Sequence, residues 1–289
     1  MATALAAWGA ARRPADEARR PTAARPGLRF GTYLAPGMIK VYEAISDQVG
    51  RELGCTTELT VEADYGAFVT DVNDVCFVCS LPYVTYQRCG IDLATPVAAP
   101  VLQGERYQGF PICFSDVVVR ADSSFRSFED LRGHSWAFNE PLSQSGYGIT
   151  RYTMLRRGLT GGFFGKVVQA GFHDTAIGMV VAGSVDGAAI DSQVLEIKSR
   201  DHPELARRLR VVDVFGPSTI QPVAVSKRLG PGVRERIRDV LVNLHEDPAM
   251  QATLAEGFIE RFVPVGPEDY DDVRAMVAAC EAAGFMELR

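Results

Sequence analysis

The sequence has no apolar run long enough to cross a membrane. The body of the chain also has no block of lysines and arginines with interleaved aromatic residues, and the formal net charge is −6. The first absence predicts that no segment spans a membrane. The second, together with the negative charge, argues against nucleic-acid binding. Any affinity for an anion must therefore come from local geometry rather than from overall charge.

A metal-binding spacing of cysteine or histidine is also lacking, although six cysteines are present. Cys76 and Cys79 form a C-x-x-C inside the apolar run Val75–Cys79, and no second C-x-x-C or H-x-x-x-H completes a zinc site. We therefore expect buried free thiols in a strand, no bound metal and no cofactor. Metal or redox chemistry at this pair is the alternative. Free thiols favour a reducing compartment.

The first 26 residues are rich in alanine, arginine and proline. A secretory signal places its positive charge before the apolar segment, whereas here the arginines follow Ala2–Ala11. We predict a disordered tail over residues 1–26 and a cytoplasmic location. An organelle transit peptide is one alternative, although Asp16 and Glu17 oppose it. A misassigned start or a trimmed signal is another, and it would be consistent with a periplasmic or extracellular location.

From residue 27 onward the hydrophobic pattern alternates between strand and helix spacing. Leu28–Tyr33 predicts a strand, Ile39–Leu53 predicts an amphipathic helix, and Val75–Cys79 predicts a strand buried on both faces. This alternation is typical of an α/β fold with parallel pairing. After Ser226 the pattern predicts helices only, over Gly232–Glu246, Pro248–Gly257 and Asp269–Ala283.

Two stretches of the chain share one arrangement. Asp71–Val78 and Gly183–Ile190 each run from a helix end through a turn with an aspartate into a buried strand. Each half of the chain therefore predicts its own α/β unit, and Phe110–Val119 and Gly216–Val225 are expected to cross between the units. Two lobes around a ligand-binding cleft follow from this. The predicted boundaries are residues 27–115 plus 222–289 for the first lobe and 116–221 for the second.

The stretch Asn139–Gly148 joins a strand exit, two serines and two glycines to a helix start. The first N–H groups of a helix lack intrahelical partners, and the helix dipole places partial positive charge there, so the turn is suited to bind an anion. Ser143 or Ser145 can serve as the N-cap or donate to a ligand oxygen, and Gly146 lets a ligand approach the backbone closely. A simple capped helix is the alternative.

Three other segments, Ser127–Gly133, Gly171–Ile177 and Gly183–Asp191, accompany Glu140–Gly146 in a fixed order. Together they resemble the phosphonate-binding solute receptors of ABC importers, a branch of the type 2 periplasmic-binding-protein fold. The resemblance extends from about Leu28 into the C-terminal tail. It implies two lobes, each a mixed and mostly parallel sheet flanked by helices, which close on a small anionic ligand in the cleft between them.

The resemblance also implies ligand-binding residues. In the family a Ser-Thr-Ser-Gly helix start binds the phosphonate oxygens, and it maps to Ser143, Gln144, Ser145 and Gly146. Gln144 departs from the family because it has an amide in place of a hydroxyl. A histidine that begins the next helix matches His173, and since a cation is unfavourable at a helix N-terminus, a facing anion would explain it. A packed helix cap is the alternative for His173.

Three further residues match positions that face the cleft in the family. Asp191, after a buried strand, would receive a ligand amine or hydroxyl, with helix capping as the alternative. Tyr33 and Tyr83 match cleft-facing aromatic residues, with core packing as the alternative for each. Ser80, at the end of the third strand, is expected to donate to the ligand.

The predicted function is binding of a small oxyanionic compound, such as a phosphonate or a phosphate ester, by hinge closure without chemistry. The partner implied is an ABC permease. Because no export signal or lipid-anchor cysteine is evident near the start, a cytosolic ligand-binding relative is a second form of this hypothesis. The alternative class is a lyase or dehydratase on the same fold, with His173, Asp191 and Glu140 as acid–base groups if they converge. A regulator's effector domain is disfavoured because no helix-turn-helix precedes Gly27.

Overall fold

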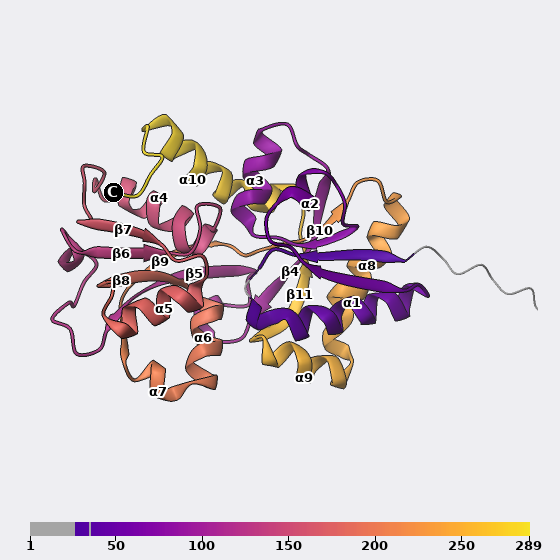
Figure 1. Ribbon diagram of the computed structural model, residues 1–289. Helices are drawn as coiled ribbons and strands as arrows, with labels where there is room; N and C mark the ends of the chain where they lie inside the picture. Colours follow the sequence, from indigo (N-terminus) through magenta and orange to yellow (C-terminus); the bar gives the residue numbers. More distant parts are fainter. Residues whose placement is uncertain (1–26, 35) are drawn as a thin grey trace, which may run out of the picture.

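The computed structural model describes residues 27–34 and 36–289, so the predicted disordered tail lies outside the described residues. Two lobes lie side by side, and each is built on one sheet (Figure 1). The first sheet contains β1 (Leu28–Thr32), β2 (Thr57–Val61), β3 (Val75–Phe77), β4 (Ala94–Leu102), β10 (Val223–Ser226) and β11 (Ile259–Pro264). The second contains β5 (Ile112–Arg120), β6 (Ser135–Phe138), β7 (Lys166–Gln169), β8 (Gly187–Asp191) and β9 (Leu209–Thr219).

Helices cover both faces of each sheet. The first lobe carries α1 (Ile39–Leu53), α2 (Gly66–Val69), α3 (Ser80–Arg88), α8 (Pro231–Asn243) and α9 (Pro248–Glu256). The second carries α4 (Ile149–Arg156), α5 (His173–Ala182), α6 (Ser192–Asp201) and α7 (Pro203–Ala206), and α10 (Asp271–Ala282) runs from one lobe to the other (Figure 1). Short 3-10 turns are η1 (Pro36–Met38), η2 (Glu105–Tyr107), η3 (Glu129–Leu131), η5 (Leu244–Glu246) and η6 (Pro267–Tyr270). The predicted two-lobed α/β fold is confirmed.

The strand order is β11-β4-β10-β3-β1-β2 in the first sheet and β7-β6-β8-β5-β9 in the second. Parallel pairing joins β1 to β2 and β3, and β6 to β7 and β8. The other pairings are antiparallel, so the expected predominance of parallel pairing is not found. The reason is that β5 and β10 enter their sheets directly from the other lobe, without the crossover helix that parallel pairing needs.

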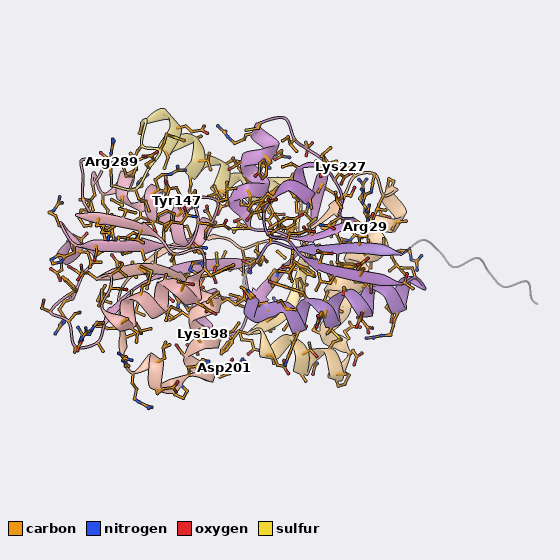
Figure 2. All side chains as sticks on the ribbon, viewed as in Figure 1. Arg29, Tyr147, Lys198, Asp201, Lys227 and Arg289 are labelled. Atoms are coloured by element: carbon orange, nitrogen blue, oxygen red, sulfur yellow. The ribbon has the colours of Figure 1, made fainter. Side chains whose placement is uncertain are left out.

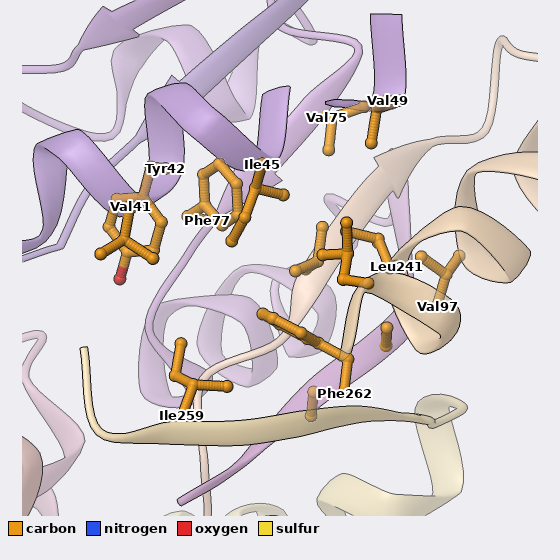
Figure 3. Close-up of a cluster of buried hydrophobic side chains, with 14 of the residues drawn as sticks. Val41, Tyr42, Ile45, Val49, Val75, Phe77, Val97, Leu241, Ile259 and Phe262 are labelled. Carbon is orange, nitrogen blue, oxygen red and sulfur yellow. The ribbon is translucent and has the colours of Figure 1, made fainter. Parts of the chain in front are cut away.

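The first core lies between the sheet and helices α1, α8 and α9 (Figure 3). In α1 the residues Val41, Ile45 and Val49 recur at helical spacing and are buried against the sheet. Tyr42 stacks on Phe77 with ring centroids 4.2 Å apart. Burial of each such side chain stabilises the fold by about 1.5–3 kcal/mol, which fixes α1 and the end of β1 near the cleft.

The C-terminal segment after α10 packs on the second lobe rather than the first. Phe285 and Leu288 belong to the second core, where they join a group of aromatic side chains that includes Trp136. The Phe163 N–H donates to the Arg289 carbonyl oxygen at 2.7 Å. Figure 2 shows Arg289 on the second lobe, whereas Arg29 and Lys227 lie on the first. The predicted first lobe therefore ends earlier than residue 289.

Two further sequence expectations need correction. The tail contains the strand β11, where only helices were expected, because a register shift between Ile259 and Arg261 breaks the alternation of buried residues. Ile112 already pairs with Thr219 in the second sheet, so the first crossing between lobes precedes the predicted boundary at residue 115. Within the described part of the chain, no helix combines the length and the apolar character that a membrane-spanning helix needs.

Candidate functional site

A cavity of about 530 Å³ lies between the two lobes. Its walls are formed by residues that follow β1 and β2 in the first lobe and β6, β7 and β8 in the second, which is the carboxyl end of each strand. Ligand sites in open α/β sheets occur at these strand ends. Predicted ligand residues that line the cavity are Tyr33, Ser143, Ser145, His173 and Asp191.

One π-helical turn, η4 (Gln144–Gly148), connects β6 to α4. Ser143 is its N-cap in an extended conformation, and the Ser143 hydroxyl accepts a hydrogen bond from the Gly146 N–H at 3.1 Å. The Tyr147 and Gly148 N–H groups both donate to the Ser143 carbonyl oxygen. Such widened turns are frequent at functional sites. The turn exposes the Ser143 and Ser145 side chains to the cavity.

Gly146 supports this turn by making room for two neighbours. A Cβ atom at this position would lie 2.0 Å from Asn139 Oδ1 and 3.1 Å from His173 Cε1. Gly146 does not line the cavity. The glycine is therefore required for the packing of Asn139 and His173, and the expected close approach of a ligand to its backbone is not what the structure presents.

Ser145, in η4, lies near His173 at the start of α5 and near Asp191 at the start of α6. Ser145 Oγ and His173 Nε2 are 3.2 Å apart, at the start of α5. Asp191 caps α6, and its Oδ1 accepts from the Gln193 N–H at 2.9 Å and the Val194 N–H at 3.4 Å. Burial raises the pKa of Asp191, and hydrogen bonds from Ser145 and these backbone groups act in the opposite direction. The capping alternative is thus observed, and the same carboxylate lines the cavity.

His173 is a buried, neutral imidazole. Burial lowers its pKa to about 4, so it carries no charge at neutral pH. This neutrality removes the conflict between a cation and the N-terminus of α5. Among the described residues, His173 Nδ1 has no hydrogen-bond partner. A neutral imidazole offers one donor and one acceptor, so while the Ser145–His173 hydrogen bond is kept only one of the two groups has a hydrogen to direct at a ligand. Both can donate to one ligand oxygen that replaces this bond.

Residues 32–270 match the protein family described as the periplasmic substrate-binding protein of phosphonate ABC transporters. The chain belongs to this family. The family is periplasmic by description, whereas the sequence alone favoured a cytoplasmic location.

Solved structures of similar fold include three binding proteins. The binding component of an ABC phosphonate transporter from Pseudomonas aeruginosa has a TM-score of 0.78 and 17% identity, over 91% of this chain and 90% of that chain. A protein from Prochlorococcus marinus in complex with methylphosphonate has a TM-score of 0.74 and 18% identity, over 88% and 98%. The periplasmic aliphatic sulphonate-binding protein of Escherichia coli has a TM-score of 0.62 and 14% identity, over 89% and 87%.

Gln144 departs from its predicted role in this substrate-binding protein. Its side chain is buried outside the cavity, where Nε2 donates to Ser218 Oγ at 2.9 Å and lies 3.3 Å from Met276 Sδ. Its backbone N–H donates to Cys79 Sγ at 3.3 Å. Because the amide is longer than a hydroxyl, it reaches past the turn and ties η4 to β9 and α10. The prediction that the Gln144 side chain faces the ligand is wrong.

Tyr83 and Ser80 also lie outside the cavity lining. Helix α3 begins at Ser80, directly after Cys79, and its backbone turns Tyr83 into the core. The Tyr83 ring packs edge-on against Tyr270 with centroids 5.4 Å apart. Core packing, the alternative for Tyr83, is what the structure shows. Ser80 is 1% exposed at the first position of the helix.

The sequence prediction missed several lining residues. Cys79 is the N-cap of α3 rather than part of a strand, and it lines the cavity, whereas Cys76 is buried in β3. Tyr65 stacks on Tyr33 with centroids 5.1 Å apart, and its hydroxyl donates to Glu140 Oε1 at 3.4 Å. Tyr65 follows β2 at the same sheet edge as Tyr33, a signal that would have identified it. Within the described residues, no cluster of three or more histidine, cysteine, aspartate or glutamate side chains is arranged to hold a metal ion.

Proposed function

We propose that this chain binds a small ligand carrying an oxyanion, such as a phosphonate or a phosphate ester, in the cavity between its lobes. One observation carries the proposal: Ser143, Ser145 and His173 line the same cavity from the starts of two helical segments, η4 and α5. Helix starts favour anions through their free N–H groups and their dipoles. The hydroxyls and the imidazole add donors that need no positive charge.

Hinge closure would complete this binding site. Val61, at the end of β2, and Phe172, before α5, lie on opposite lobes, and both line the cavity. They are among the exposed large apolar residues, at 52% and 55% exposure. Removal of both from water on closure would favour the closed, ligand-bound state. As a member of its family, the protein would then deliver the ligand to an ABC permease from the periplasmic side.

An enzyme on the same fold is the alternative, and His173, Asp191 and Glu140 do line one cavity. In a catalytic triad, however, a carboxylate accepts from the Nδ1–H of the histidine that activates the serine. Here the Asp191 carboxylate accepts hydrogen bonds from the start of α6, and no described residue bonds to His173 Nδ1. This connectivity favours ligand binding over nucleophilic chemistry.

Calorimetric titration tests the proposal with methylphosphonate, phosphate and methanesulfonate as probes. We expect saturable binding of at least one probe, with the ligand mass unchanged afterwards. Ser145→Ala and His173→Ala should each weaken it about tenfold, since each removes one hydrogen bond to a charged group. Ser124→Ala, at an exposed loop serine, is the matched control. Unchanged affinity in both cavity variants would refute the oxyanion site, and a changed ligand mass would favour the enzyme.

A further inference from the structure

The C-terminal segment of the chain contacts η4 outside the cavity. Helix α10 runs from the first lobe to the second, and it ends before Gly284, whose φ of +61° is left-handed (Figure 1). The Gly284 N–H donates to the Glu281 carbonyl oxygen and the Phe285 N–H to the Cys280 carbonyl oxygen, which is the Schellman arrangement. This helix end turns the chain onto the second lobe. We call residues 283–289 the C-terminal strap.

The C-terminal strap is anchored in the second core. Phe285 and Leu288 are 2% and 7% exposed among the aromatic residues of that core. The Phe163 N–H donates to the Arg289 carbonyl oxygen at the end of the strap. Burial of the two apolar side chains favours the docked strap because it removes them from water. The Met286 side chain lies between them in sequence and is exposed, so this residue contacts the lobe through its backbone carbonyl group.

The Met286 carbonyl oxygen accepts two hydrogen bonds from η4 and the helix that follows it. The Tyr147 hydroxyl donates to it at 3.1 Å, and Arg151 Nη1 donates to it at 2.9 Å. The Arg151 guanidinium also lies over the Tyr147 ring, with Cζ 5.3 Å from the ring centroid. At the other end of η4, Gln144 Nε2 lies 3.3 Å from Met276 Sδ in α10. The C-terminal part of the chain therefore contacts both ends of η4, and none of these five residues lines the cavity.

Arg151 is a buried charge without a carboxylate partner. It is 7% exposed, and within residues 27–34 and 36–289 no acidic group forms an ion pair with it. The more exposed Arg106, in contrast, is paired with Asp116 at 2.7 Å. Arginines are seldom buried unless they are paired, because the lost hydration is costly. The Met286 carbonyl oxygen and the Tyr147 ring stabilise the Arg151 charge, so the strap and the start of α4 depend on each other.

We propose that the C-terminal strap positions η4 for the ligand. The Met286 carbonyl group, through Tyr147 and Arg151, keeps the turn in the shape that presents Ser143 and Ser145 to the cavity. The binding role of the two serines rests on the proposed function. When the strap detaches, Tyr147 and Arg151 lose their acceptor and η4 gains other shapes. The apparent affinity then falls with the fraction of molecules whose turn keeps the competent shape.

Calorimetry with methylphosphonate tests this role on Tyr147→Phe and Arg151→Met, each shown to be folded by circular dichroism. Each variant removes one donor to the Met286 oxygen and keeps an apolar side chain in its place. We expect Tyr147→Phe to bind about three- to tenfold more weakly and Arg151→Met about tenfold or more, since the second removes a charge-assisted hydrogen bond. Arg151→Lys keeps the charge and a donor, so it should regain part of the affinity.

Tyr152→Phe is the matched control on the same helix. Tyr152 lies in α4 outside the cavity lining, and its hydroxyl forms no hydrogen bond with any described residue. This variant should bind methylphosphonate as the wild-type protein does.

Hydrogen exchange supplies a readout that a role in fold stability alone would not change. Without ligand, the amides of residues 144–148 should exchange faster in Tyr147→Phe and Arg151→Met than in Tyr152→Phe. Because coupling between two sites is reciprocal, saturating methylphosphonate should slow exchange in residues 283–289 of the wild-type protein. Unchanged exchange at η4 in both variants, or wild-type affinity in both, would overturn the role of the strap and leave the oxyanion site standing. Failure of folded wild-type protein to bind methylphosphonate, phosphate or methanesulfonate would refute the proposed function and this inference with it.

Discussion

Gly146→Ala is the substitution whose effect the structure defines most closely. The new Cβ would lie 2.0 Å from Asn139 Oδ1, 3.0 Å from Asn139 Cγ and 3.1 Å from His173 Cε1. Asn139 and His173 are 9% and 6% exposed and line the cavity, so relief of the overlap would displace them toward the ligand site. Overpacking of this kind costs about 1–3 kcal/mol. Alanine regains about 0.5–1 kcal/mol over glycine in helical backbone, so we expect a net loss of about 1 kcal/mol.

Gly178→Ala provides a matched control in the neighbouring helix. Gly178 is exposed within α5, and no described atom outside its own helix backbone and chain neighbours lies within 4 Å of the Cβ position. This variant should therefore gain about 0.5–1 kcal/mol from helix propensity. Urea unfolding at a common pH measures both, with the m-value checked for constancy. If Gly146→Ala is stabilised as much as Gly178→Ala, the packing of Asn139 and His173 around the turn is not as described.

Three further predictions follow from the same contacts. Because burial lowers the pKa of His173 to about 4 from 6.5, its contribution to stability should be complete above pH 6.5 and lost as the pH falls through 4, by up to about 3 kcal/mol. Urea titrations should show that His173→Gln loses less unfolding free energy between pH 6.5 and pH 4 than the wild-type protein does. An equal loss in the two proteins would contradict the burial of His173. Tyr83→Phe should leave phosphonate affinity unchanged, because Tyr83 packs in the core. A tenfold loss of affinity would indicate that the Tyr83 hydroxyl contacts the ligand. Phe172→Ala should weaken binding mainly through faster dissociation in stopped-flow measurements, since Phe172 lines the cavity with an exposed ring that lobe closure would bury. An unchanged dissociation rate would argue against closure at this residue.

The sequence predicted the fold well where local patterns agree with the final packing. The α1 residues Val41, Ile45 and Val49 keep strict helical spacing, and β3 is a short apolar run, so both elements were predicted nearly correctly. β11 was missed because a bulge spaces its buried residues, Ile259 and Phe262, three apart. The return of the C-terminal segment to the second lobe depends on tertiary contacts that no local pattern encodes.

The site was predictable in its backbone positions but less so in its side-chain directions. Ser143, Ser145 and His173 lie at helix starts, and a helix start fixes where its first side chains point. Tyr83 and Gln144 fail because the start of a helix at Ser80, and a long amide side chain in place of a hydroxyl, each direct a group away from the cavity. The hydrogen bond from Tyr65 to Glu140 joins positions 75 residues apart, which sequence spacing does not reveal.

A crystal structure of the protein with methylphosphonate would test the central claim most directly. The account predicts one molecule in the cavity between closed lobes, with phosphonate oxygens within about 3 Å of Ser145 Oγ and a His173 ring nitrogen. A phosphonate bound elsewhere, or bound in the cavity without contact to Ser145 or His173, would contradict the account.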